Sequence, residues 1–189
     1  MDKSLIEEGV RLILRGIGED VDREGLKNTP RRVAEMYEEL FSGIGSDPAQ
    51  ILQPLFDENH DEMIIVKDIP FYSVCEHHMV PFVGKAHIAY VPNKSGKIVG
   101  LSKLTRVLEI VSRRLQVQER LTTLIADAIM TQLEPRGAMI IVEAEHLCMS
   151  IRGVKKPNTL TVTSAVRGLF RQNPASRAEA MALIKSDRK

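Results

Sequence analysis

The two cysteines of the chain constrain its fold more than any other residues, because each lies beside histidines at a spacing that suits a metal ion. One lies in residues 75–78, Cys-Glu-His-His, and the other in residues 146–148, His-Leu-Cys. Thiolate sulfur and imidazole nitrogen are the ligands that Zn²⁺ prefers in proteins. A fold that brings these two distant segments together offers three or more ligands to one metal ion.

Composition argues against several classes of protein. Among the 189 residues, 26 Lys and Arg balance 25 Asp and Glu, which gives no support for a nucleic-acid-binding tail or a polybasic membrane surface. Trp is absent and aromatic residues make up 4%, so a stacking platform for single strands is not expected. The first residues are acidic and no apolar stretch reaches the length of a membrane span, so we expect a cytoplasmic protein. In that reducing compartment, two cysteines indicate metal binding or catalysis rather than a disulfide.

The hydrophobic pattern predicts helices first, then strands, then a long helical segment and further strands. Helical periodicity covers residues 4–16, 29–43, 103–132 and 174–186, with a break expected near residues 116–118. Apolar or alternating runs predict strands at residues 63–66, 71–75, 84–91, 138–145 and 159–166. This order indicates an α+β protein with antiparallel pairing. We expect an N-terminal helical extension, residues 1–58, followed by the catalytic domain, residues 59–189.

The spacing of the ligands favours an open metal site. Cys75 and His78 can share a metal ion across a tight turn, and if the second strand continues to Cys148, His146 and Cys148 point to the same face. A site of Cys75, His78 and Cys148 leaves a fourth tetrahedral position for water, whose pKa zinc lowers toward neutrality. His77 and His146 would then stay free for proton transfer.

Other interpretations of these residues stay open at this point. Cysteines in a core are often small apolar residues without a ligand role, and a closed structural zinc site with His146 as the fourth ligand has the same spacing. His87 lies within an expected strand and is interpreted as a satisfied structural histidine, and His60, in an acidic loop, as solvated.

Positive side chains follow the expected starts of two helices, where the helix dipole favours negative charge. They are Arg31 and Arg32 after Thr29-Pro30, and Lys103 and Arg106 after Ser102, the expected N-cap, with Arg152 as a further cation. Phosphates bind readily at helix N-termini, so these cations suggest an anionic ligand, although exposed helix starts also tolerate Lys and Arg. The P-loop and the dinucleotide fingerprint are both missing from the sequence.

Gln118 and Glu119 lie where the long helical pattern breaks. A carboxylate at a helix break can enter a pocket and accept two N–H bonds from a planar heterocycle. The Watson–Crick edge of guanine offers that pair of donors. A solvated glutamate on the surface of a helix is the alternative.

Together these residues closely resemble the GTP cyclohydrolase I family, from about residue 25 to residue 170. The similarity lies in several segments that follow the family's order, namely residues 28–33, 75–84, 100–106, 116–121, 146–149, 152–154 and 163–165. They include Asn-Thr-Pro-Arg-Arg-Val, Cys-Glu-His-His, Gly-Leu-Ser-Lys-Leu-Thr-Arg and Gln-Val-Gln-Glu-Arg-Leu.

The resemblance implies a role for each of the residues already singled out. The implied zinc ligands are Cys75, His78 and Cys148. The implied catalytic residues are His77, His146 and Ser102, the last of these near the ribose. The implied substrate contacts are Glu119 and Gln118 at the guanine edge, and Lys103, Arg106, Arg152 and, from a neighbouring subunit, Arg32 at the triphosphate.

The resemblance also implies a fold, an assembly and a reaction. The family has the tunnelling fold, a four-stranded antiparallel sheet with two helices on one face, and the sheets of several subunits close into a barrel. Its members are homodecamers of two stacked pentamers with sites between subunits. They convert GTP and water into 7,8-dihydroneopterin triphosphate and formate, the first step of pterin and tetrahydrofolate biosynthesis. Zinc and a proton-donating histidine suit hydrolytic attack at C8 of guanine.

Two other functions share part of this sequence signal. A related zinc hydrolase that acts on another purine nucleotide or pterin precursor would keep the metal but lack the carboxylate of Glu119. A non-catalytic, zinc-stabilised oligomeric module would lack the open metal position and the two unligated histidines.

Overall fold

The computed structural model describes residues 1–186 and divides the chain into two compact units, one covering residues 1–42 and the other starting at residue 43. The first unit is a pair of helices, α1 (Lys3–Gly16) and α2 (Thr29–Leu40). These helices contact each other and bury Leu14 and Ala34, whereas Leu5, Ile13 and Met36 of the predicted apolar pattern are exposed. Both expected helices of the N-terminal extension are therefore confirmed.

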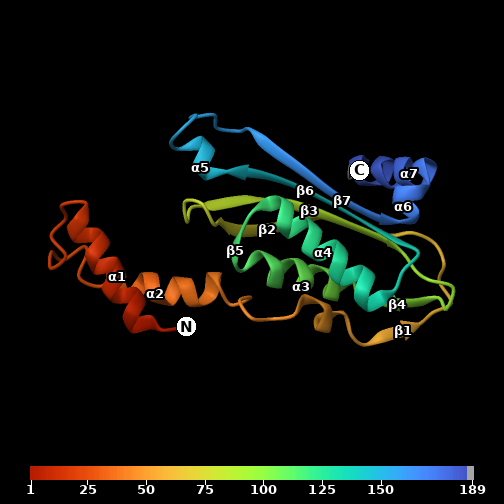
Figure 1. The fold of residues 1–189 in the computed structure, drawn as a ribbon, viewed down its shortest axis with the longest axis horizontal. Helices are drawn as coiled ribbons and strands as arrows, with labels where there is room; N and C mark the ends of the chain where they lie inside the picture. Colours follow the sequence, from red (N-terminus) through yellow and green to blue (C-terminus); the bar gives the residue numbers. More distant parts are fainter. Residues whose placement is uncertain (187–189) are drawn as a thin grey trace. The chain divides into compact units, whose positions relative to one another are not determined.

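The second unit is built on one sheet whose long strands are all antiparallel (Figure 1). In spatial order these strands are β2 (Ile64–Cys75), β3 (Pro81–Val91), β6 (Gly137–His146) and β7 (Leu160–Gly168). A two-residue strand, β5 (Leu115–Gln116), pairs in parallel with the end of β2. A separate small sheet joins β1 (Leu55–Asp57) to β4 (Lys97–Val99). The expected α+β class with antiparallel pairing is confirmed.

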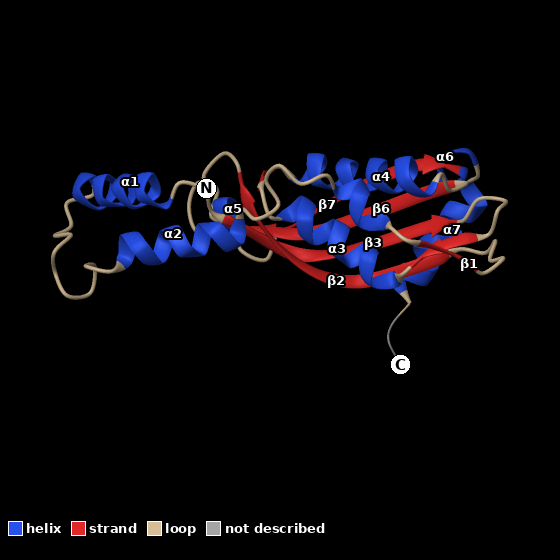
Figure 2. Cartoon of the chain, turned by 90° about the horizontal axis from the view of Figure 1, so that it is seen from below, coloured by secondary structure: helices blue, strands red, loops and turns tan. Residues whose placement is uncertain are grey.

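Helices cover both faces of the large sheet. Figure 2 shows α3 (Leu101–Ser112) and α4 (Gln118–Leu133) along one face, where they enclose the main core. The other face packs against α6 (Leu169–Gln172) and α7 (Pro174–Lys185) over a smaller core. Successive side chains of a strand point to opposite faces of the sheet, so β6 contributes to both cores. Ile140 belongs to the main core and Ile141 to the smaller one. Two short turns, η1 (Pro48–Leu52) and α5 (Leu147–Ser150), complete the described elements.

The expected strands at the first edge of the sheet differ from the structure. The strands expected at residues 63–66 and 71–75 are one strand, β2, whose pairing with β3 shifts register between Val66 and Ile69. This bulge interrupts the alternation of side chains, and the apolar pattern therefore looks like two strands. The second compact unit begins at residue 43, and Leu52 is fully buried in its main core. The division into an N-terminal extension, residues 1–58, and a catalytic domain, residues 59–189, stays a prediction.

The long helical pattern does break where the sequence indicates. α3 ends at Ser112, β5 occupies Leu115–Gln116, and α4 begins at Gln118. The break places the first turn of α4 next to the end of β2, because β5 pairs with Val74 and Cys75. Within the described part of the chain, the helices are all too short or too polar to cross a lipid bilayer.

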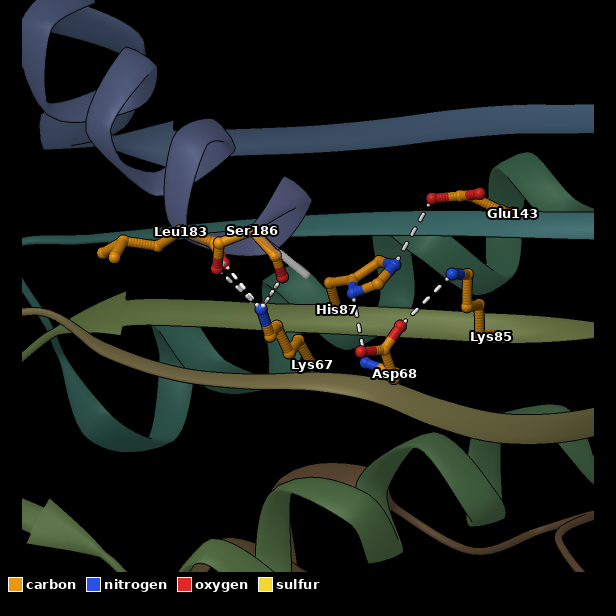
Figure 3. A network of polar contacts seen from close by, with 7 residues as sticks. All are labelled: Lys67, Asp68, Lys85, His87, Glu143, Leu183 and Ser186. Atoms are coloured by element: carbon orange, nitrogen blue, oxygen red, sulfur yellow. Dashed lines mark hydrogen bonds and ion pairs between the residues drawn. The ribbon is translucent and has the colours of Figure 1, made fainter. Parts of the chain in front are cut away.

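A polar network lies on the bulge of β2, on the sheet face that carries α7 (Figure 3). His87 of β3 is 1% exposed, and its Nδ1 accepts the backbone N–H of Asp68 at 3.1 Å. Its Nε2 lies 3.4 Å from Oε1 of Glu143 on β6. Lys67, in the same bulge, donates to the carbonyl oxygens of Leu183 and Ser186 at the end of α7. The bulge thus joins three strands and the last helix.

Candidate metal centre and active site

The first metal-binding segment forms a tight turn between β2 and β3. The N–H of Met79 donates to the carbonyl of Cys75 at 2.9 Å, and the N–H of Cys75 donates to the carbonyl of Val80 at 2.9 Å. Met79 closes the turn with a positive φ of 54°. Cys75 is buried, whereas His77 and His78 are exposed. The turn therefore presents one sulfur from the core and two imidazoles toward solvent.

The second segment does not continue as a strand, so the expectation that His146 and Cys148 share a strand face was wrong. β6 ends at His146, and Cys148 lies in the single helical turn of α5. The carbonyl of Leu147 accepts the N–H of Ile151 at 3.0 Å, as in a helix, and strand alternation ends there. The position of Cys148 is set by this turn.

The two segments converge all the same. The Sγ atoms of Cys75 and Cys148 lie 4.0 Å apart, and the ligand atoms of Cys75, His78 and Cys148 all lie within 4.8 Å of one another. Zn–S bonds of about 2.3 Å would place two sulfur ligands of a tetrahedral ion about 3.8 Å apart. The spacing of the three residues therefore fits a zinc ion. Within residues 1–186, no other three His, Cys, Asp or Glu side chains form such a group.

The electrostatics of this group also favour a cation. Burial, and then the neighbouring sulfur of Cys75, raise the pKa of the Cys148 thiol. A metal ion would offset the unfavourable free energy of ionising this thiol, because it binds cysteine as thiolate. Arg152 Nη1 lies 3.1 Å from Nε2 of His78. Since a guanidinium can only donate, Nε2 of His78 accepts this hydrogen bond.

His146 is held rigidly at the end of β6. Its Nε2 lies 2.8 Å from Oε1 of Gln118, and its ring stacks on Phe82 with centroids 4.6 Å apart. The amide nitrogen of Gln118 donates to the carbonyls of Val142 and Thr161, at 3.0 and 2.9 Å. The amide oxygen is therefore the acceptor, and His146 carries its proton on Nε2. Burial lowers the pKa of His146, so the imidazole is neutral near pH 7.

Gln118 and Glu119 are adjacent but have different surroundings. Gln118 is 1% exposed, and its amide nitrogen also lies 3.1 Å from Oγ1 of Thr163. Glu119, in the first turn of α4, is exposed. Of the two residues expected at the guanine edge, Glu119 alone presents its side chain to solvent. The link between Gln118 and His146 was not found from the sequence.

The expected N-cap of α3 is wrong by two residues. Gly100 occupies the cap position, and its carbonyl accepts the N–H of Lys103 at 2.8 Å. Ser102 lies inside the helix because α3 begins at Leu101. Its hydroxyl is therefore not used as a cap, and Ser102 and Arg106 are exposed on the first half of the helix.

The residues singled out on α3 lie away from the metal-binding group within one chain. Figure 1 shows α3 running from the β4 end of the sheet toward β5, where β2 ends. At 1.5 Å of rise per residue, Ser102 lies about 15 Å along the helix from Ser112. The carbonyl of Ser112 accepts the hydroxyl of Ser73, near the end of β2, at 2.6 Å. Arg32, on α2, belongs to the first unit.

Two acidic residues near the site were not predicted from the sequence. Oε1 of Glu145 accepts the hydroxyl of Ser150 at 2.6 Å and the N–H of Asn158 at 2.9 Å, which ties the loop carrying Arg152 to β6. These hydrogen bonds, that from Ser150 first, lower the pKa of Glu145. Glu76, within the first metal-binding turn, pairs with an arginine of α4. The sequence around Glu145 and Glu76 does not indicate these contacts, because the fold determines which residues lie beside each carboxylate.

The fold and the site define a class of protein. Three soft ligands converge at one end of an antiparallel α+β sheet, and two further histidines lie in the same segments. Three protein ligands are typical of hydrolytic zinc sites, whereas structural zinc sites are closed by four. The arrangement could hold a metal ion with an open position, as hydrolases with a metal site do.

Sequence comparison identifies the family. The family model described as GTP cyclohydrolase I matches residues 6–185, and the chain belongs to this family. GTP cyclohydrolase 1 of Pelotomaculum thermopropionicum is 63% identical over 184 residues, which cover 97% of each chain. GTP cyclohydrolase 1 of Carboxydothermus hydrogenoformans is 62% identical over 184 residues, covering 97% of this chain and 95% of its own. GTP cyclohydrolase 1 of Bacillus pumilus is 58% identical over 187 residues, covering 99% and 98%.

A solved structure, the archaeosine synthase QueF-Like in the apo form, superimposes with a TM-score of 0.46 and 13% identity. The match covers 56% of this chain and 93% of that one. Similarity at this level defines neither the fold nor the function of the chain.

Proposed function

We propose that the chain opens the imidazole ring of GTP by hydrolysis at C8, releases formate and rearranges the product to 7,8-dihydroneopterin triphosphate. The observation that carries this proposal is the convergence of Cys75, His78 and Cys148 in a chain that belongs to the GTP cyclohydrolase I family. The net reaction uses one water and removes C8 of the purine as formate.

The metal ion of the proposed site is zinc, held by Cys75, His78 and Cys148. The donor set of two sulfurs and one imidazole, and the 4.0 Å between the sulfurs, suit this ion. Bound there, zinc supplies a Lewis acid and lowers the pKa of water at the fourth position. Metal-binding thiols also suit a reducing compartment, which supports a cytoplasmic location.

His146 is proposed to accept a proton through Nδ1. Because Gln118 fixes the proton of the neutral ring on Nε2, Nδ1 carries the free lone pair. The stacked ring of Phe82 prevents the imidazole from tilting, so the lone pair keeps one direction. Gln118 acts here as a positioning residue, since its amide is already used by β6 and β7.

His77 is proposed to deliver a proton to N7 of guanine. Its side chain is 64% exposed on the same turn as two of the zinc ligands, so it can reach a ligand in front of the metal. Protonation at N7 makes C8 more electrophilic and prepares the C–N bond for cleavage. The exposed carboxylate of Glu119, on the first turn of α4, is proposed to accept the two N–H donors of the guanine edge.

The triphosphate is proposed to bind between subunits. Arg152 lies beside His78 in the same chain, whereas Ser102, Lys103 and Arg106 lie toward the other end of the sheet. A neighbouring copy that places the start of its α3 at this metal centre would complete the site, with Ser102 near the ribose and Lys103 and Arg106 at the phosphates. Arg32 of a neighbouring copy is proposed to join them.

The assembly that would achieve this is the family's barrel of tunnelling-fold sheets in a homodecamer. β7 is an edge strand of nine residues, and β5 pairs with only the last two residues of β2 at the opposite edge. Both edges therefore leave backbone N–H and C=O groups available for pairing with another copy. The exposed Leu160 and Val162 of β7 give such a contact an apolar component.

Incubation of the purified, zinc-loaded protein with GTP tests the proposal. Formate and, after oxidation, a fluorescent pterin should appear in equal amounts, and a chelator should abolish both. A Glu119→Ala variant should retain zinc but lose turnover of GTP, since the guanine edge loses its acceptor. Absence of product from GTP in a protein with zinc bound would overturn the proposed function.

A further inference from the structure

An ion pair between Glu76 and Arg120 connects the two parts of the proposed site. Nη2 of Arg120 lies 3.1 Å from Oε1 of Glu76, and Nη1 contacts Oε2, so that the guanidinium and the carboxylate meet through two parallel bonds. Paired bonds of this kind fix orientation as well as distance. Glu76 lies between Cys75 and His77 in the metal-binding turn, and Arg120 follows Glu119 on α4.

The backbone makes the same connection. The N–H of Glu76 donates to the carbonyl of Gln116 at 3.0 Å, just beyond the pairing of β5 with β2. A short parallel pairing of two residues is weak by itself. The Glu76–Arg120 ion pair adds a side-chain contact beside this backbone contact. The metal-binding turn and the start of α4 are therefore joined at two points.

Stability alone does not account for this pair. The side chain of Arg120 is 49% exposed and that of Glu76 is 30% exposed, and ion pairs with such exposure contribute little to folding. Arg120 also lies in the first turn of α4, where the helix dipole disfavours a cation.

We propose that Arg120 and Glu76 are positioning residues, which hold the turn carrying Cys75, His77 and His78 at a fixed distance from Glu119. This inference rests on the proposed function, in which the turn binds the metal and Glu119 binds guanine. If one end of the substrate is fixed by Glu119 and the reacting carbon must face the turn, the distance between these two elements determines the alignment of C8. A displacement of about 1 Å between reacting groups can lower a rate about 100-fold.

The carboxylate of Glu76 also faces His77. Its Oε1 lies 3.9 Å from Nε2 of His77, so Arg120 orients a carboxylate that lies beside a proposed catalytic imidazole. Arg120 itself is not a catalytic residue in this account. It acts through Glu76 and the turn.

Two readouts on the full-length, zinc-loaded protein test the inference. In Arg120→Ala and Glu76→Ala, kcat for GTP should fall about tenfold or more while KM changes by less than about twofold, because alignment rather than affinity is lost. The double variant should be no slower than the slower single variant, since both substitutions remove one interaction. Arg120→Lys should recover part of kcat, because an ammonium keeps the charge but not the paired geometry.

The second readout does not depend on activity. Hydrogen exchange of the Glu76 amide should become about fivefold faster in Arg120→Ala, because the junction opens more often, while zinc content and global stability stay unchanged. Arg23→Ala is the matched control: its side chain is also 49% exposed and paired at 2.9 Å, with Glu19, in the first unit. It should change neither kcat nor exchange at residues 75–80.

Several outcomes would overturn the inference. Arg120→Ala could raise KM with kcat unchanged while Glu76→Ala has no effect, which would make Arg120 a direct substrate contact. Unchanged exchange at Glu76, or loss of zinc from either variant, would also contradict a positioning role. If the wild-type protein fails to turn over GTP, the proposed function fails, and the exchange measurement still decides whether the pair holds the turn.

Discussion

At the scale of single residues, His146 shows how the neighbours of a proposed catalytic side chain fix its orientation and its protonation. Gln118 fixes the proton on Nε2, Phe82 fixes the plane of the ring, and burial keeps the imidazole neutral. The sequence places His146, Cys75 and Cys148 in ligand-like spacing, because that signal is local. It does not reveal Gln118 as the support of His146, because that contact depends on how β6, β7 and α4 meet.

Substitution of Gln118 tests this support. Gln118→Leu should lower the free energy of unfolding by about 1–3 kcal/mol, because the buried carbonyls of Val142 and Thr161 lose their donor. The same change should lower kcat, since Nε2 of His146 loses its acceptor and the ring can exchange its tautomer. Urea denaturation and GTP turnover measure the two effects. A variant with wild-type stability and kcat would contradict the assigned contacts.

At the scale of secondary-structure elements, local periodicity was informative where an element is long and failed where it is short or irregular. It located α1, α2, the break between α3 and α4, and β6. It missed the continuity of β2 because the bulge at Lys67 and Asp68 disrupts alternation. It did not predict α5, a single turn too short to show a period. In both places the tertiary contacts of the element decide its conformation.

The bulge of β2 predicts a pH dependence of stability. Burial lowers the pKa of His87 below its value in the unfolded chain, while Glu143 and Asp68 raise it and Lys85 lowers it further. The folded state therefore binds the proton less readily, so stability is complete above about pH 6.5 and falls as pH decreases from there toward the lowered pKa. Protonation would also place an N–H on Nδ1 against the N–H of Asp68.

His87→Gln provides the comparison for this prediction. The amide can still accept from Asp68 and donate to Glu143, but it does not titrate. Urea denaturation between pH 7.5 and pH 5 should show a steeper loss of stability in the wild-type protein than in this variant. Equal slopes for the two proteins would contradict the assignment of the pH dependence to His87.

At the scale of the whole molecule, the proposed site is divided between two ends of the sheet. The proposed metal ligands and Arg152 lie at the β5 end. The helix α3, whose first half carries Ser102, Lys103 and Arg106, starts toward the β4 end. The spacing of residues in the sequence does not show this separation. It also does not show which copy of the chain contributes each residue to a site. The barrel and the decamer come from the family resemblance, and the edge strands of the sheet are compatible with them.

Complementation tests whether the site is shared. Arg106→Ala and Cys148→Ser should each be inactive, because one lacks a phosphate contact and the other a zinc ligand. When the two variants are unfolded and refolded together, mixed oligomers should regain part of the activity, since some interfaces pair an intact α3 with an intact metal centre. Refolding of each variant alone is the control. No recovery in mixtures that form oligomers would place all these residues in one chain's site.

The central claim is that Cys75, His78 and Cys148 hold a catalytic zinc ion while His77 stays free to move protons. Zinc content and formate release, measured together in His77→Ala and Cys148→Ser, test it most directly. His77→Ala should keep one zinc per chain and lose about 100-fold or more in turnover of GTP, whereas Cys148→Ser should lose zinc and turnover together. Loss of zinc from His77→Ala, or full zinc occupancy in Cys148→Ser, would contradict the account.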